Sequence, residues 1–238
     1  MEQMFTRKEG ENLKSLKLIL EKTNKEGLLV GVRTDGKNYS VREHRQHFLM
    51  PDIWLKFVGA LKSPKAKLTA EVLIQLGCRI NEARHIEERD IDYDRNSIRL
   101  RITKCKATKG ERVGKPRTIP VNSFFIKKLK KHFSTLEPGS MIGILSTPAF
   151  NISMKKALRK INYEEWYMIS AHGIRKTHGN WLKILGDLRI MNISATEICL
   201  RLGHDYGTFL KDYGSSSIMD NKDVLMVKQI LGDLYQQR

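Results

Sequence analysis

Apolar residues recur at intervals of three and four through most of the chain, which is the spacing of one helix face. The first clear stretch follows Pro51, a residue suited to the first helical position, and runs over 52–61. The same spacing predicts further helices over 66–76, 81–88, 124–133, 152–161, 172–184 and 224–234, with a short helical turn over 208–212. The pattern therefore indicates a mainly helical fold.

Capping residues mark several of the expected helix ends. Gly77 closes the helix over 66–76, so Arg79 falls at the joint between two helices. Ser194 and Glu197 have the spacing of a capping box, and the helix that they open stops at Gly203.

Two segments alternate as strands do. Residues 97–103 alternate strictly, and 117–121 form a second run in which Pro120 suits an edge strand. Lysines and glycines fill 104–115 between them. We expect an antiparallel hairpin with a long basic tip, and hence an α+β, mainly α-helical fold with a small antiparallel hairpin or sheet.

The first 48 residues differ from the rest. Leucines at helical spacing predict an amphipathic helix over 8–25, and Asp35-Gly36 predicts a hairpin turn between two short apolar runs. The expected organisation is an N-terminal appendage over 1–48, a main domain over 49–215 and a C-terminal amphipathic helix within 216–238. That last helix either packs on its own domain or docks on a neighbouring protomer, and the sequence leaves both open.

Composition points to a polyanionic partner. Lys and Arg number 43 against 26 Asp and Glu, a formal charge of +17. Nucleic acid is the commonest partner for such an excess, because cationic side chains that neutralise phosphates release condensed counterions. An anionic membrane surface or ribosomal RNA would also suit the charge. Neither a membrane-spanning apolar run nor a signal peptide is evident, so we expect a cytoplasmic protein without a membrane partner.

The cysteines and early histidines do not suggest a metal site. Cys78, Cys105 and Cys199 are far apart and odd in number, which is typical of reduced thiols. His44 and His47 lie among arginines and are expected to be solvated. No cofactor and no metal are predicted.

The candidate chemistry lies mainly in the last third of the chain. His172-Gly-Ile-Arg175 is followed by Gly203-His204 and then Tyr213. Such a set suits attack on a phosphodiester by a phenol. Arginines are the best metal-free clamp for the phosphate oxygens, and Arg79 with Arg175 is the chosen pair. Tyr213 would be the nucleophile, His172 and His204 would move the phenol proton and bind the phosphate, and a loop lysine would protonate the leaving oxygen.

Taken in order, these residues resemble the active-site motifs of the tyrosine recombinases, or phage integrases. The matching elements are Gly77-Cys-Arg79-Ile-Asn-Glu82, Thr103-Lys104, Arg117-Thr-Ile-Pro120, His172-Gly-Ile-Arg175, Leu202-Gly-His204 and Tyr213. The resemblance covers roughly 48–215. It implies that family's catalytic fold, with Glu82 supporting Arg79 and Lys104 as the general acid. Because the hairpin tip is long, Lys106 and Lys109 are alternatives, and Tyr206 is the rival nucleophile. His178 is expected to be a packed core residue.

The resemblance also implies an activity and partners. The expected function is metal-independent, site-specific recombination or integration of double-stranded DNA through a covalent 3′-phosphotyrosine, by a homo-tetramer at the nucleoid of a prokaryotic, viral or plasmid-borne system. The first 48 residues are too few for the family's usual N-terminal DNA clamp, which suggests accessory DNA-bending proteins or arm contacts. Two other functions are considered: relaxation of DNA by a type IB topoisomerase, and DNA binding without catalysis.

Overall fold

The computed structural model describes residues 48–101, 116–203, 206–207, 209 and 219–232, together with the backbone of 4–5, 16–23, 29–33 and 38–40. These residues belong to two compact units, Met1–Arg45 and Gln46–Arg238.

The first unit contains a four-stranded antiparallel sheet in the order β1-β2-β3-β4. Its strands are β1 (Met4–Phe5), β2 (Leu16–Thr23), β3 (Leu29–Arg33) and β4 (Asn38–Ser40).

The expected hairpin is confirmed, because Val32 pairs with Asn38 on either side of the predicted turn. The helix expected over 8–25 is wrong where the structure describes it. Leucines at 16, 18 and 20 also fit alternation, and pairing with the neighbouring β3 selects the extended form. His44 and His47 lie outside the described residues.

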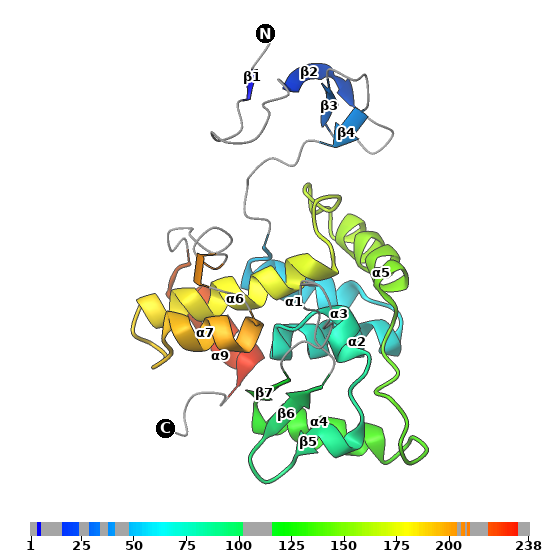
Figure 1. Ribbon diagram of the computed structural model, residues 1–238, viewed down its shortest axis with the longest axis vertical. Helices are drawn as coiled ribbons and strands as arrows, with labels where there is room; N and C mark the ends of the chain where they lie inside the picture. The colour runs from blue at the N-terminus through cyan, green and yellow to red at the C-terminus, as the bar shows by residue number, and fades with distance from the viewer. Residues whose placement is uncertain are drawn as a thin grey trace, which may run out of the picture. The chain divides into compact units, whose positions relative to one another are not determined.

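The second unit is mainly helical (Figure 1). Most of its helices lie within a few residues of their predicted positions. They are α1 (Pro51–Ala60), α2 (Pro64–Leu76), α3 (Ile80–Ala83), α4 (Ser123–Phe133), α5 (Thr147–Lys160), α6 (Ala171–Asp187), α7 (Ala195–Leu202) and α9 (Asn221–Leu231).

Helix α3 is shorter than predicted, because it ends at Ala83 although the apolar spacing extends to 88. A short 3-10 turn, Glu88–Asp90, occupies the end of that stretch, and the carboxylate of Asp90 accepts the backbone N–H of Glu87 at 2.9 Å. A local side-chain bond to the backbone thus competes with continued helix there.

The core centres on α2 and α6, which pack against each other along their buried faces. Trp54 of α1 meets Trp181 of α6 edge to face, with ring centroids 6.2 Å apart. Buried Leu49 joins the start of the unit to α6: its N–H donates to Thr177 Oγ1 at 2.9 Å and its carbonyl accepts from Trp181 Nε1 at 3.0 Å. These bonds satisfy a buried backbone segment that belongs to no helix.

The main-domain sheet is antiparallel and ordered β5-β6-β7, with β5 at Ile91–Asp92, β6 at Ser97–Leu100 and β7 at Arg117–Pro120. The hairpin prediction is confirmed for β6 and β7, and Pro120 ends the edge strand β7. Strand β5 was not predicted, because two residues carry no readable alternation. The α+β, mainly helical class is confirmed.

Helix α9 packs on the unit that contains it. Val224, Val227 and Leu231 are buried, and the helix contacts α1. The side-chain amide of Gln75 donates to the carbonyl of Ile230 at 2.5 Å. Docking on a second protomer stays a prediction. Among the described helices, none combines the length and the apolar character needed to cross a membrane.

Candidate active site

Four of the predicted site residues fall in the described part of the chain: Arg79, Glu82, His172 and Arg175. The others lie outside it, namely Lys104 with its alternatives Lys106 and Lys109, His204 and Tyr213.

Arg79 lies at the joint between α2 and α3, as predicted. Gly77 ends α2 with a φ of 59°, and a Cβ there would come within 2.9 Å of the His178 Cγ. Glycine therefore allows the chain to pass directly against α6 before Arg79. Between them, Cys78 is fully buried, and burial followed by the charge of Glu82 raises the pKa of its thiol to about 12. This thiol remains protonated and inert.

The carboxylate of Glu82 binds two arginines. It accepts the backbone N–H of Arg79 at 2.9 Å and its Nη1 at 3.1 Å, and it accepts Arg117 Nη2 at 2.7 Å and Nη1 at 3.3 Å. Burial alone would raise the pKa of Glu82, but the hydrogen bond and charge of Arg117 outweigh it and lower that pKa. Glu82 is therefore an ionised carboxylate that holds Arg79, and its supporting role in catalysis stays a prediction.

Arg175 joins two segments that come from distant parts of the chain. It is fully buried on α6; its Nη1 donates to the Gly77 carbonyl at 3.0 Å, and its Nη2 donates to the carbonyl of Leu202. The guanidinium thus lies against the segment before Arg79 and against the end of α7. His172, one turn earlier on α6, is exposed.

A second cluster of polar residues is buried in the same domain and is centred on Arg201 of α7. Arg201 donates from Nε to His178 Nε2 at 2.8 Å, from Nη1 to the Pro120 carbonyl at 2.6 Å and from Nη2 to the Gln75 carbonyl at 2.6 Å. His178 Nδ1 lies 2.5 Å from the Ile74 carbonyl. A carbonyl can only accept, so His178 is the neutral Nδ1–H tautomer. Burial first, and then the charge of Arg201, lower the pKa of His178 well below 6.5. His178 is a core residue, as expected.

Two arginines of this network were not among the predicted site residues. Arg117 opens β7, and its Nε donates to the carbonyl of Arg201 at 3.0 Å. Its signal was present as the first residue of the Arg-x-Ile-Pro motif, although no role was attached to it. Arg201 lies directly before Leu-Gly-His, and its sequence neighbourhood resembles an ordinary helix surface.

Tyr206, the rival nucleophile, is 56% exposed. Its ring lies tilted on Phe209, with centroids 6.4 Å apart.

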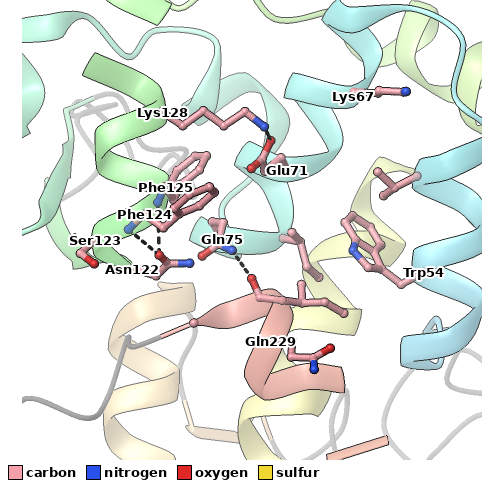
Figure 2. A pocket seen from close by; sticks show the side chains of 14 residues that line it. Trp54, Lys67, Glu71, Gln75, Asn122, Ser123, Phe124, Phe125, Lys128 and Gln229 are labelled. Carbon is pink, nitrogen blue, oxygen red and sulfur yellow. Dashed lines mark hydrogen bonds and ion pairs between the residues drawn. The ribbon is translucent and has the colours of Figure 1, made fainter. Parts of the chain in front are cut away.

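A cavity of about 580 Å³ lies elsewhere in the domain, lined by residues of α1, α2, α4 and α9 (Figure 2). Glu71 and Lys128 form an ion pair at its edge, and Phe124 is 74% exposed there. Gln75 links this cavity to the buried cluster, because its side chain binds α9 while its carbonyl accepts from Arg201. None of the four predicted site residues that the structure describes lines the cavity.

No protein-family model and no curated protein matches the chain. Solved structures do match its fold. The XerA recombinase aligns with a TM-score of 0.55 at 14% identity, over 76% of this chain and 64% of that one. The Tn1549 transposon integrase, solved with transposon right end DNA, aligns at 0.57 and 16%, over 82% and 68%. The XerH recombinase bound to its difH substrate aligns at 0.53 and 18%, over 78% and 56%.

The chain therefore has the fold of the tyrosine recombinase catalytic domain. It spans about two thirds of the XerA recombinase chain and little more than half of the XerH chain.

Proposed function

We propose that the chain is a site-specific DNA recombinase or integrase that cleaves and rejoins strands through a 3′-phosphotyrosine. One observation carries the proposal. The Nη1 of Arg175 bonds the carbonyl of Gly77 at 3.0 Å, two residues before Arg79. The guanidinium of Arg175 thus lies against the segment that leads to Arg79, although the two residues are far apart in the sequence. A pair of arginines is the best metal-free clamp for a phosphate.

In the proposed reaction Tyr213 Oη attacks the scissile phosphorus and the bond from phosphorus to O5′ breaks. The phenol gives up its proton, for which His172 and His204 are the candidate acceptors, while O5′ gains a proton from Lys104. The products are a 3′-phosphotyrosine and a free 5′-hydroxyl. Attack by the 5′-hydroxyl of a partner strand reverses the same exchange and rejoins the DNA. Because one phosphoester bond replaces another, the step needs no external energy source.

The arginines would act by fixed charge. The non-bridging oxygens gain charge as the phosphorus becomes five-coordinate, and donors already in position stabilise that charge without reorganisation. Arg79 is oriented by Glu82, and its side chain keeps 32% of its surface exposed. Arg175 is oriented by two backbone carbonyls. The guanidinium of Arg79 has five N–H groups, more than its side-chain bond to Glu82 uses, so it can also donate to a phosphate.

The excess of positive charge supports double-stranded DNA as the substrate. We include in the proposal a homo-tetramer on DNA, accessory DNA-bending proteins and a cytoplasmic site of action. Basic residues set the affinity for DNA, whereas the choice of site depends on base contacts.

The test begins with duplexes selected for binding from a random pool. Each is remade with a nick close to the cleavage position. Cleavage then releases a short fragment that diffuses away, so the strand cannot be rejoined and the protein stays covalently attached. Wild type should form an adduct, Tyr206→Phe should form it as well, and Tyr213→Phe should form none. An adduct with Tyr213→Phe would transfer the role to Tyr206.

The other functions give different outcomes in the same assays. Selected duplexes that bind wild type but never yield an adduct would indicate a binding protein without catalysis. Relaxation of supercoiled DNA without strand exchange between two sites would indicate a topoisomerase. Recombinant products from two sites that carry the selected sequence are the expected result.

A further inference from the structure

We propose that Arg117 is a positioning residue that couples Arg79 to the corner formed by Leu202 and Gly203. This inference rests on the proposed function and adds a residue to its site.

The first contact is with Glu82. Arg117 donates to both carboxylate oxygens, Nη2 to Oε2 at 2.7 Å and Nη1 to Oε1 at 3.3 Å. The pair is largely removed from water, since the Arg117 side chain is 14% exposed and that of Glu82 is 3% exposed. A bidentate, desolvated bond of this kind is strong and directional. Glu82 uses the same oxygens to hold the backbone and side chain of Arg79.

The second contact is with the end of α7. The Nε of Arg117 donates to the carbonyl of Arg201 at 3.0 Å. Its guanidinium also lies against Gly203, where an added Cβ would stand 3.2 Å from Cζ and Nη1. Gly203 has a φ of 65°, so glycine serves both the helix end and the close approach.

These contacts define how Arg117 can act. Nε, Nη1 and Nη2 are all directed at protein acceptors, so the residue works through Glu82 and the α7 corner. A lysine could replace the charge but not the three-way geometry, because an ammonium is a single point donor on a flexible stem. Among the described residues, loss of Arg117 leaves Arg79 as the one side-chain partner of Glu82, and it frees Arg79 to change its orientation.

The test compares adduct formation on two substrates, an ordinary phosphodiester and a methylphosphonate at the scissile position. The methyl group replaces one charged oxygen, so the transition state needs less help from a guanidinium. We expect Arg117→Ala to slow cleavage of the phosphodiester about 10–100-fold, as loss of an orienting partner does elsewhere. The loss should be much smaller on the methylphosphonate, and Arg117→Lys should recover little of it.

Two comparisons identify the route of action. Arg79→Ala should cleave the phosphodiester more slowly than Arg117→Ala does. The double variant should cleave it no more slowly than Arg79→Ala. Arg95→Ala is the matched control, because it removes the same charge from a side chain that is 86% exposed and pairs only with Asp92 among the described residues. If Arg117 had a purely structural role, Arg117→Ala would slow adduct formation by the same factor on both substrates. The double variant would then be slowed by the product of the two single effects. Either result would overturn the inference.

A second measurement does not depend on activity. Gly203→Ala should lower the urea midpoint of unfolding more in wild type than in Arg117→Ala, because the clash with the guanidinium exists only in the former. Equal shifts would contradict the contact. The two proposals also fail differently. No adduct with wild type refutes the proposed function, whereas an adduct formed equally fast by wild type and Arg117→Ala refutes the positioning role alone.

Discussion

Arg201 donates its Nε–H to Nε2 of His178 at 2.8 Å, in a position where both side chains are buried. The histidine is the acceptor, so it must be neutral for the bond to exist. This bond connects α7 to α6, and the other donors of Arg201 connect α7 to β7 and α2. The end of α7, where the motif Leu-Gly-His begins, is thus held by the buried guanidinium of Arg201.

The neutral state of His178 predicts a pH dependence of stability. Its pKa in the folded protein lies well below 6.5, so the unfolded chain binds the proton more readily and acid favours unfolding. The contribution is complete above pH 6.5. Below that it declines by up to about 1.4 kcal/mol per pH unit until the folded pKa is reached. His178→Gln, which removes this titration, should be less stable than wild type at pH 7.5, and the gap should narrow toward pH 5. Parallel profiles in urea unfolding would contradict this.

Replacement of Gly77 by alanine should destabilise the protein more than the same change at another glycine with a left-handed backbone, Gly139. Gly77→Ala adds a Cβ that meets the ring of His178, whereas Gly139 has a similar φ of 80° and nothing within 4 Å of its added Cβ. Both changes carry the backbone penalty of a left-handed residue, and only the first also overpacks the core. We expect Gly77→Ala to cost about 1–3 kcal/mol more than Gly139→Ala in free energy of unfolding. Equal costs would show that α6 yields to the added methyl group.

Glu82→Gln should destabilise the protein and slow cleavage. The amide keeps the shape but loses the charge that two arginines share, and breaking a buried pair costs about 3 kcal/mol. The pKa of Glu82 is lowered, so its contribution is present above pH 4.5 and is lost as the pH falls through the folded value. The difference between wild type and variant in urea unfolding should therefore be constant near pH 7 and shrink in acid. A difference that does not change with pH would exclude the charge as its cause.

The N-terminal boundary of the main domain can be tested by truncation. A chain that begins at Gln46 keeps Leu49, whose backbone binds Thr177 and Trp181, and it should unfold cooperatively. A chain that begins at Pro51 loses these two bonds and a fully buried leucine, at a cost of about 3 kcal/mol or more. Thermal unfolding followed by circular dichroism measures the difference. Equal midpoints would place the boundary after Leu49.

The hairpin lysine can be identified by changing the leaving group. A substrate with sulfur in place of O5′ releases a thiolate, which needs little protonation, so loss of the general acid should matter little. Lys104→Ala should cleave the oxygen substrate much more slowly than wild type does, and it should cleave the sulfur substrate at a rate close to that of wild type. Lys106→Ala and Lys109→Ala are the matched comparisons, and recovery by either of them would assign the role to that residue.

Most helix ends were predictable because they depend on neighbouring residues. Gly77 and Gly203 take the left-handed conformation expected of helix C-caps, and Ser194 with Glu197 forms the predicted capping box. Strand β2 was missed because its leucines fit two periods, and only pairing with β3 decides between them.

The site was predictable only where a motif encodes it. Arg79, Glu82 and Arg175 could be proposed from their spacing, whereas the partners of Arg117 lie 35 and 84 residues away along the chain. A buried arginine also contradicts the usual expectation that charge lies on the surface. The catalytic roles of all the predicted site residues stay predictions: Arg79, Glu82, Lys104, His172, Arg175, His204 and Tyr213.

Arg175 is held by main-chain oxygens of residues 77 and 202. Any amino acid supplies such an oxygen, so these two bonds depend on the path of the backbone, which Gly77 allows, and not on the side chains of residues 77 and 202. This offers a physical reason why chains of 14–18% identity can share the fold. Distant relatives should accordingly be sought with a sparse pattern of glycines and arginines at fixed separations.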